Sequence, residues 1–378
     1  MILRTALTLT LSGLAVAAVA QDVPAPIEPE VFFVEEGIKE GPYIFGVSGS
    51  WTGASNVYTL GHDLELKGNV SPGMQPAAAV TADASKIYAM SNYNARIMWG
   101  ETTSVVQEFD VQTQSLLREF EVPAKLAMVD SQPALIQLSS DEKFVLVQNA
   151  TPATSVSVVD LEKGEFLVEI PTPGCWGILP MVNANTFTTI CGDGTFATYS
   201  WNADGTFGEP AKSEQIFDVD ADALFTNPAV MNGKLVFASF KGNLYVVDIT
   251  GETAVLDEVL PMTEGVEGDW APSGSEVIAG HEATNTVYVL MHSGAYEGSH
   301  KNESEEIWAY DIANKTLGYR SFSDAEDTLM MVQGDVPMLY AAGNGSINFY
   351  EVDPTARYAA RITNSWKSGN IGMMIAPN

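Results

Sequence analysis

A hairpin pattern that recurs about seven times constrains the fold of this 378-residue chain more than any other feature. In each copy an alternating apolar strand runs into an Asp or another polar turn residue, and a second alternating strand follows. The copies begin at Asn56, Ser104, Ser155, Phe196, Asn243, Glu306 and Ser346, and the Phe196 copy is degenerate. A spacing of roughly 40 to 60 residues is typical of the blades of a β-propeller.

Two further strand candidates precede the hairpins, as in residues 133–150 and 228–242. Four strands per unit and about seven units predict an all-β fold, a seven-bladed β-propeller of four-stranded antiparallel blades over residues 41–378. A pair of β-sandwiches is the alternative, but the steady long period favours the propeller, and helical periodicity is scarce. Because the first and last blades must meet, the chain before Phe45 and the strand 371–375 are candidates to complete one shared blade.

The N-terminal segment has the features of a secretory signal peptide. Residues 1–20 combine a short basic start, an apolar run and the small-residue ending Ala18-Val19-Ala20, which predicts cleavage and export to the periplasm. The apolar run is too short to cross a membrane, and no later segment reaches the roughly 18 apolar residues of a membrane helix. Residues 21–40 are rich in Pro, Glu and Val, and we expect them to form an N-terminal arm.

Both cysteines, Cys175 and Cys191, fall in the segment 172–192, which resembles two strand ends joined by a turn-rich loop. Since an exported protein meets an oxidising environment, we expect one disulfide between them. In the chain-entropy description such a bridge stabilises the fold by about 3 kcal/mol. Two unpaired buried thiols are the alternative.

A net charge of −30 limits the partners of the chain. Nucleic acid and anionic membrane surfaces are excluded, because the summed field repels both. Solubility is the simplest reason for the charge, and a saline habitat or a basic partner are alternatives.

Motifs that carry chemistry are absent from the sequence. It contains no G-x-S-x-G elbow, no P-loop, no G-x-G-x-x-G after a strand and no C-x-x-C-H haem site. Asp218, Asp220 and Asp222 alternate but lack the Gly and Glu of a calcium loop. The sequence therefore predicts no catalytic, cofactor-binding or metal-binding residue on this chain.

The histidines and tryptophans likewise show no pattern typical of a catalytic or metal site. The four histidines are His62, His281, His292 and His300, and they form no H-E-x-x-H motif and no other closely spaced pair. His292 and His300 flank a Glu-rich loop, where a solvated loop is favoured over a metal site. The seven tryptophans are scattered, and we interpret most of them as packing between blades.

Several segments resemble one family in order along the chain. They include residues 99–113, 172–197 and 297–316. The most specific parts are the Cys175–Cys191 spacing with its following Gly-Asp-Gly, and the Gly-Ser-His-Lys loop that leads into a hairpin. On these residues the chain resembles the heavy (large) subunit of the quinoprotein amine dehydrogenases, the methylamine and aromatic-amine dehydrogenases. The resemblance covers most of the mature chain.

The resemblance implies a propeller that binds a small, cysteine-rich light subunit in a two-plus-two heterotetramer. The light subunit carries tryptophan tryptophylquinone. The complex oxidises a small primary amine to an aldehyde and ammonia, and it passes electrons to a cupredoxin or a cytochrome c. This chain would then scaffold the light subunit and wall the substrate channel. It is not the light subunit, because two cysteines cannot supply that subunit's disulfide framework.

The resemblance also implies one site residue and one departure. An aromatic residue of an early blade gates the quinone pocket in the family, and Trp51 within Val47–Asn56 is the nearest candidate here. An ordinary packed Trp in the first blade is the alternative. The family's Trp-Arg-Pro-Gly-Gly turn lacks its Arg in the segment Trp270–Gly274, so the light-subunit interface is expected to differ.

Two functions of other classes remain open. One is a free-standing periplasmic β-propeller that binds a ligand or protein without catalysis. The other is a propeller enzyme of its own, such as a lactonase or a pyrroloquinoline-quinone dehydrogenase. The second is less favoured, because the acidic and histidine ligands that calcium or quinone docking requires form no cluster.

Overall fold

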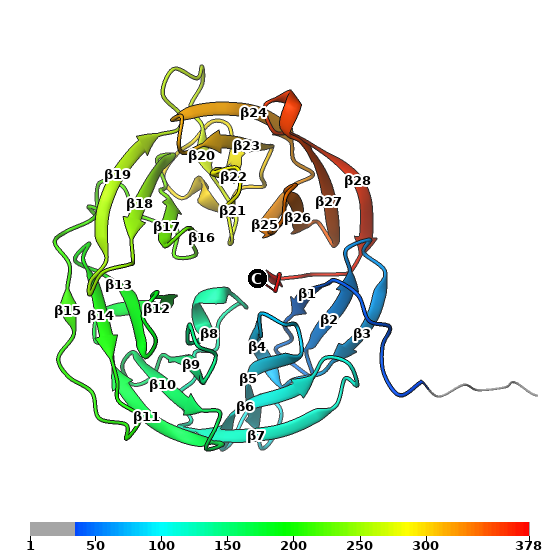
Figure 1. Ribbon diagram of the computed structural model, residues 1–378, viewed down its shortest axis with the longest axis vertical. Coiled ribbons are helices and arrows are strands. Elements are labelled where there is room, and N and C mark those ends of the chain that lie inside the picture. Colours follow the sequence, from blue (N-terminus) through cyan, green and yellow to red (C-terminus); the bar gives the residue numbers. More distant parts are fainter. Residues whose placement is uncertain (1–34, 378) are drawn as a thin grey trace, which may run out of the picture. The chain divides into compact units, whose positions relative to one another are not determined.

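A computed structural model describes residues 35–377 of the chain, and its strands form seven blades around a central axis (Figure 1). The all-β, seven-bladed propeller of antiparallel blades is confirmed. The predicted signal peptide and residues 21–34 of the predicted arm lie outside the described residues. The described part of the chain contains no helix with the length and hydrophobicity that a membrane span requires.

Each blade has an innermost, a second, a third and an outermost strand. The innermost strands are β29 (Met373–Ile375), β4 (Met74–Val80), β8 (Ile136–Leu138), β12 (Cys175–Pro180), β16 (Ala229–Met231), the pair β20 (Ala271–Pro272) and β21 (Ile278–His281), and β25 (Glu326–Val332). The second strands are β1 (Tyr43–Ser48), β5 (Lys86–Asn94), β9 (Phe144–Asn149), β13 (Thr186–Cys191), β17 (Lys234–Ala238), β22 (Thr286–His292) and β26 (Met338–Gly343). The third strands are β2 (Asn56–Gly61), β6 (Thr102–Asp110), β10 (Ser155–Asp160), β14 (Phe196–Ser200), β18 (Asn243–Asp248), β23 (Glu306–Asp311) and β27 (Ser346–Asp353). The outermost strands are β3 (Leu66–Val70), β7 (Leu116–Val122), β11 (Glu165–Pro171), β15 (Ala211–Lys212), β19 (Val255–Pro261), β24 (Thr316–Phe322) and β28 (Ala359–Lys367). We number the blades 1 to 7 in this order. Within residues 35–377, three short 3-10 turns complete the secondary structure: η1 (Pro133–Leu135), η2 (Ser299–Lys301) and η3 (Pro354–Ala356).

The two ends of the propeller close the ring in blade 1, as the sequence predicted. Strand β29 pairs antiparallel with β1, with Phe45 opposite Ile375 and Val47 opposite Met373. The N–H of Gly372 adds a hydrogen bond of 2.9 Å to the carbonyl of Val47. Because both ends of the propeller contribute strands to blade 1, every blade has a neighbouring blade on each side. The faces between the blades are therefore covered.

All seven repeated hairpins form the third and outermost strands of the blades. The Asp at the end of the third strand orders the turn. Its carboxylate accepts the backbone N–H of Thr113 at Asp110 (2.7 Å), of Thr250 at Asp248 (2.9 Å) and of Asn314 at Asp311 (2.8 Å). A side-chain acceptor of this kind stabilises a tight turn without a further backbone partner.

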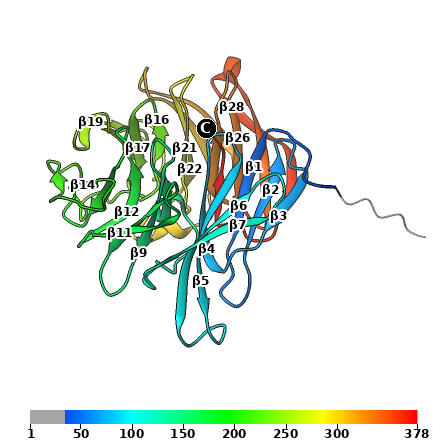
Figure 2. The ribbon, with the colours of Figure 1, turned by 60° about the horizontal axis from the view of Figure 1, so that its bottom comes forward.

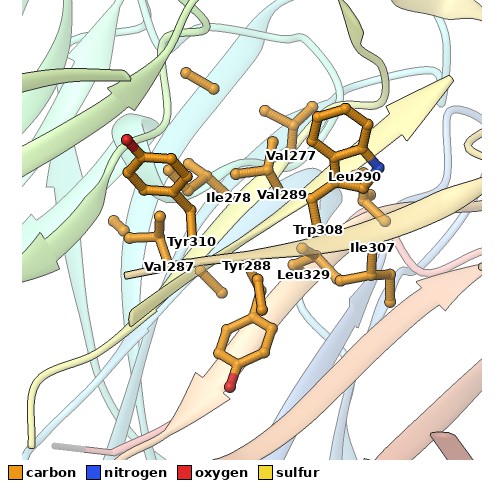
Figure 3. Close-up of a cluster of buried hydrophobic side chains, with 14 of the residues drawn as sticks. Val277, Ile278, Val287, Tyr288, Val289, Leu290, Ile307, Trp308, Tyr310 and Leu329 are labelled. Atoms are coloured by element: carbon orange, nitrogen blue, oxygen red, sulfur yellow. The ribbon is translucent and has the colours of Figure 1, made fainter. Parts of the chain in front are cut away.

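Burial decreases from the middle of each blade to its outer edge. Every residue of β22 is buried, because blades 5 and 7 cover both of its faces, whereas β24 is largely accessible. Figure 3 shows a cluster of buried hydrophobic side chains, where Trp308 and Tyr288 pack among Val and Leu side chains of blade 6. Trp308 is 0% exposed. Strands covered on both faces read as nearly continuous apolar runs, and the edge strands alternate.

Blade 6 departs from the repeat, because its innermost strand is split into β20 and β21. The intervening segment bends toward blade 7, where the N–H groups of Ser275 and Glu276 lie 2.7 and 3.1 Å from the carbonyl of Asp327. Gly274 is required there: its φ is +128°, and a Cβ would lie 2.6 Å from that same carbonyl oxygen. The interruption brings Glu276 to the propeller axis.

The disulfide lies in blade 4. Cys175 of β12 and Cys191 of β13 stand directly opposite each other in the register, and their sulfur atoms are 2.01 Å apart. The bridge therefore joins the two inner strands of one blade, as the sequence predicted, and it does not link two blades.

Candidate functional site

Loops gather on one face of the propeller because of strand direction. In antiparallel blades, the loops between second and third strands open on the same side as the connections between blades. Figure 2 shows the β1–β2 loop, in blue, and the β5–β6 hairpin, in cyan, extending on the same side. The first holds residues 49–55 and the second holds residues 95–101. We call this side the Trp51 face.

A cavity of about 430 Å³ opens at the axis on the Trp51 face. It is lined by loops of several blades, among them residues Trp51, Gln75, Asp130, Asn227, Ser275 and Asp327. Trp51 is 45% exposed, so it is not packed inside blade 1. We call this space the Trp51 cavity.

Hydrogen bonds between blades hold the walls of the Trp51 cavity. The N–H of Gln75 donates to the carbonyl of Ser50 (3.2 Å), and its side-chain amide donates to Asp130 (3.4 Å). The side-chain amide of Asn227 lies 3.5 Å from both the Gln132 side-chain oxygen and the Ser275 carbonyl. These contacts connect blades on opposite sides of the axis.

The charges of the Trp51 cavity are mostly negative. Asp130 and Asp327 line it, and none of its lining residues is Lys or Arg. Asp327 is accessible to solvent inside the cavity, and desolvation by the surrounding protein raises the pKa of its carboxyl above the usual value. The hydroxyl of Ser131 donates to the backbone carbonyl of Pro76, so it is not paired with a base.

The β1–β2 and β5–β6 hairpins carry exposed apolar side chains on this face, and together we call these the apolar rim. It consists of Trp51, Tyr93, Ile97, Met98 and Trp99, and Trp99 is 71% exposed. The two loops meet through the β3–β4 connection, where Ser55 N–H donates to the Pro72 carbonyl (3.2 Å) and Gly73 N–H donates to the Ser91 hydroxyl (3.1 Å). Exposed apolar patches of this kind mark interaction sites.

Sequence reasoning missed most of this apolar rim. The interpretation of tryptophans as packing residues is correct for Trp201 and Trp308 and wrong for Trp99. A signal was present, since Ile97, Met98 and Trp99 are three consecutive apolar residues in a hairpin turn. A solvated turn normally carries polar residues at such positions.

The histidines occupy separate places. His281 bonds to the Thr284 hydroxyl (2.9 Å) and the Gly334 carbonyl (3.0 Å), and burial lowers its pKa. His292 is buried in β22, whereas the His300 ring stacks on Phe240 at 4.5 Å and lines the Trp51 cavity. Within residues 35–377, no group of three or more His, Cys, Asp or Glu side chains is placed to hold a metal ion.

The alternating aspartates serve local structure. The carboxylate of Asp218 accepts the N–H groups of Asp220 and Ala221, each at 3.0 Å. Asp222 accepts the N–H of Lys241 (3.0 Å) and the side-chain amide of Asn243 (2.7 Å). These oxygens are therefore occupied by donors of the same chain.

Ala271, which replaces the Arg of the family's Trp-Arg-Pro-Gly-Gly turn, lies inside blade 6. Ala271 is buried and stands opposite His292 in the register. Arg320 of β24 covers the neighbouring Trp270, with its guanidinium carbon 4.4 Å from that ring and 4.8 Å from the ring of Trp308. The Glu306 carboxylate holds this guanidinium through two hydrogen bonds. A cation of this chain thus already lies over both indole rings.

Comparisons with known proteins agree along most of the chain. A family model described as "Methylamine dehydrogenase heavy chain (MADH)" matches residues 47–370. The methylamine dehydrogenase heavy chain of Methylobacillus flagellatus is 27% identical over 295 residues, which cover 76% of this chain and 72% of the relative. The corresponding heavy chain of Paracoccus versutus is 28% identical over 298 residues, covering 76% and 68%.

Solved structures show the same architecture at much lower identity. The periplasmic gluconolactonase PpgL of Pseudomonas aeruginosa superposes with a TM-score of 0.60 at 13% identity, covering 88% of this chain and 98% of that one. A putative 6-phosphogluconolactonase of Bacteroides fragilis gives 0.61 at 11% identity, covering 89% and 98%. At these identities the likeness concerns the propeller fold alone.

Proposed function

The chain belongs to the methylamine dehydrogenase heavy chain family, and on this premise we propose that it is the large subunit of a periplasmic amine dehydrogenase. The complex would oxidise a small primary amine to an aldehyde and ammonia and pass the electrons to a cupredoxin or a cytochrome c. The observation that carries the proposal is the family match over residues 47–370.

The partner in this proposal is a small, cysteine-rich light subunit in a two-plus-two heterotetramer. The apolar rim on the Trp51 face is the surface of this chain that best fits such a partner. Exposed Trp, Tyr and Met side chains are enriched at the centres of protein interfaces and account for much of their affinity. The light subunit would bury Trp99 and its neighbours, with the Trp51 cavity at the edge of the contact.

The redox cofactor, tryptophan tryptophylquinone, is assigned to the light subunit. It supplies the oxidation of the amine when that subunit is bound. The tryptophans of this chain support the assignment. Among residues 35–377, the pair in ring contact is Trp270 and Trp308, at 5.3 Å between centroids. Trp308 is fully buried and Arg320 lies over both rings, so this pair is engaged in the packing of blade 6.

The residues of this chain would act on the substrate by sterically limiting its path. Trp51 stands half-exposed at the lip of a cavity whose walls are fixed by hydrogen bonds between blades. In this position its indole would narrow the path from solvent to the partner's cofactor, exclude water and limit the size of the amine. No proton transfer or covalent step is assigned to this chain.

Isolation of the native complex tests the assignment of partner and cofactor. The chain is purified from the periplasm of the organism that produces it, after growth on an amine. Co-purifying subunits are examined by mass spectrometry and by their absorption spectra. We expect a small subunit with modified tryptophans and amine-dependent reduction of an added dye. A colourless chain without a partner would contradict the proposal and favour a free-standing binding module.

A pair of tryptophan variants separates the gate from the docking surface. We expect Trp51→Ala to raise kcat/KM for bulky amines relative to small ones, because the path widens. The matched variant Trp99→Ala should weaken light-subunit binding by about 2 kcal/mol and leave that ratio unchanged. An unchanged ratio in the assembled Trp51→Ala complex would remove Trp51 from the gate.

A further inference from the structure

A second cavity opens at the other end of the axis, on the face opposite the Trp51 face. Its volume is about 440 Å³, and it narrows from an accessible rim at Ala82, Ser140 and Val230 to a buried floor. Asn227 lines both this cavity and the Trp51 cavity. The last strand, β29, forms one of its walls, so we call it the C-terminal cavity.

The walls of the C-terminal cavity are mainly apolar. Its aliphatic and thioether side chains come from the innermost strands of different blades and include Ile136, Ile278, Leu329, Met331, Met373 and Met374. None of its lining residues is Lys, Arg or His. A hydrocarbon chain of a few carbons would find apolar contacts along these strands.

One carboxylate stands at the floor of this cavity without a countercharge. Glu276 is 4% exposed, and its Oε1 has no hydrogen-bond partner among residues 35–377. Its backbone is fixed, since its carbonyl accepts the N–H of Leu329 at 2.8 Å. The interrupted strand of blade 6 therefore holds an acceptor at the axis that the fold itself does not satisfy. Buried polar groups of this kind are costly unless a partner is supplied.

The neighbouring charges add to the need for a cation. Burial raises the pKa of Glu276 well above its usual value and the negative charge of Asp327 adds to this, while the backbone of Met374 favours the ionised form. A second carboxylate, that of Glu142, lies at the rim and accepts the N–H of Ala82 at 2.7 Å. A positive ligand at the floor would be attracted by the Glu276 carboxylate and by the negative charge of Asp327.

We propose that the C-terminal cavity binds a small organic ammonium ion, whose charged head donates hydrogen bonds to the carboxylate of Glu276 and whose hydrocarbon chain lies against Ile278, Met373 and Met374. A metal ion fits less well, because calcium and magnesium require several oxygen ligands and this floor presents one carboxylate. The site belongs to this chain alone. It is independent of a light subunit, and so of the proposed function.

The test uses the full chain, labelled with ¹³C at the methionine methyl groups, in amine-free buffer. n-Butylammonium chloride is titrated while methyl shifts are recorded by NMR, and 1-butanol and calcium chloride serve as comparison ligands. We expect saturable shifts of Met373 and Met374 with butylammonium, whereas the buried Met262 of blade 5, outside the cavity, should not respond. Glu276→Gln should weaken binding at least tenfold. Glu252→Gln, the same substitution at an exposed turn of blade 5, should leave the dissociation constant within twofold.

Several outcomes would overturn the proposal. They are the absence of shifts at Met373 and Met374, equal binding of 1-butanol, saturable binding of calcium in place of butylammonium, and unchanged affinity in Glu276→Gln. The folding of that variant is checked by the unchanged methyl spectrum of Met262. Because no dye reduction is measured, failure here leaves the assignment as an amine dehydrogenase subunit standing, and success does not depend on it.

Discussion

A carboxylate in an outer hairpin accepts hydrogen bonds from its own turn, whereas the carboxylate in the axial segment of blade 6 has an oxygen without a donor in residues 35–377. At the end of β18, the Asp248 carboxylate accepts both the N–H and the hydroxyl of Thr250, and these bonds lower its pKa. At the axis, Glu276 has an oxygen without a donor among the described residues, and burial raises its pKa. The Asp of the outer hairpin is satisfied within its own turn, whereas the interrupted element leaves a carboxylate oxygen available to a ligand.

A second contrast concerns the aromatic side chains. Trp308 lies in a third strand and is enclosed by two blades, while Trp99 lies at a hairpin tip in solvent. Trp308 belongs to the outer hairpin of blade 6 and Trp99 to the β5–β6 hairpin of blade 2, and an indole in a hairpin sequence can be buried or exposed. The difference teaches that stability resides between the blades and that the loop tips are free to serve recognition. The following predictions test these two contrasts.

The largest effect is expected at Trp308. Trp308→Ala should lower the free energy of unfolding by about 3–5 kcal/mol, because it removes a fully buried indole and leaves a cavity between blades. Trp99→Ala should change the same quantity by less than about 0.5 kcal/mol, since the side chain is in solvent in the isolated chain. Urea unfolding followed by circular dichroism measures both. Similar losses in the two variants would break the contrast between the blade interior and the loop tips.

The disulfide of blade 4 should have the next largest effect. Replacing Cys175 and Cys191 together by Ser should lower the free energy of unfolding by about 3 kcal/mol, because a 16-residue loop is then unconstrained in the unfolded chain. Since the bridge lies within one blade, we expect the other blades to keep their hydrogen-exchange protection in the variant. Loss of protection around the whole ring would show instead that blade 4 closes the propeller.

Much of the fold followed from local rules. The seven hairpins were predictable because alternation and a turn residue act within about twenty residues. The pairing of β1 with β29 followed from the requirement that a ring closes, although the sequence says nothing of its register. The split of β20 and β21 was not predictable. It depends on a contact between Gly274 and Asp327, which are distant in sequence and meet only in the folded ring.

The site was harder to predict from the sequence, because its residues also come together only in the folded ring. Trp51 could be selected by resemblance, and the structure places it at the lip of a cavity. Glu276 could not be selected, because one Glu in an irregular segment has no local signal of burial. Ile97, Met98 and Trp99 had a signal in their apolar turn, yet an apolar run is also what a buried strand shows. Burial is a property of the assembled blades.

The pH dependence of stability should reveal Glu276. Its folded pKa is raised above the usual 4.5, so the folded state favours the protonated form, and stability should decline as the pH rises from 4.5 through the folded pKa. Glu276→Gln should lack this decline and be more stable at pH 7 by about 1–2 kcal/mol, since a neutral amide is less costly to bury. Thermal unfolding between pH 4 and pH 8 in amine-free buffer measures it. Parallel curves for both proteins would mean that the Glu276 carboxylate is already satisfied.

The smallest effect is expected at the turn of β18 and β19, and its sign is opposite. The pKa of Asp248 is lowered from 3.8 by the Thr250 hydrogen bonds, so its contribution is present above pH 3.8 and is lost as the pH falls through the lower folded value. Asp248→Ala should cost about 1 kcal/mol at pH 7, the usual net value of such hydrogen bonds, and progressively less in acid. Asp248→Asn keeps an acceptor without a charge, so it should lie between the two proteins at neutral pH and show less dependence on acid. If Asp248→Ala and Glu276→Gln shift stability in the same direction at pH 7, the distinction between self-satisfied hairpins and an unsatisfied axis fails.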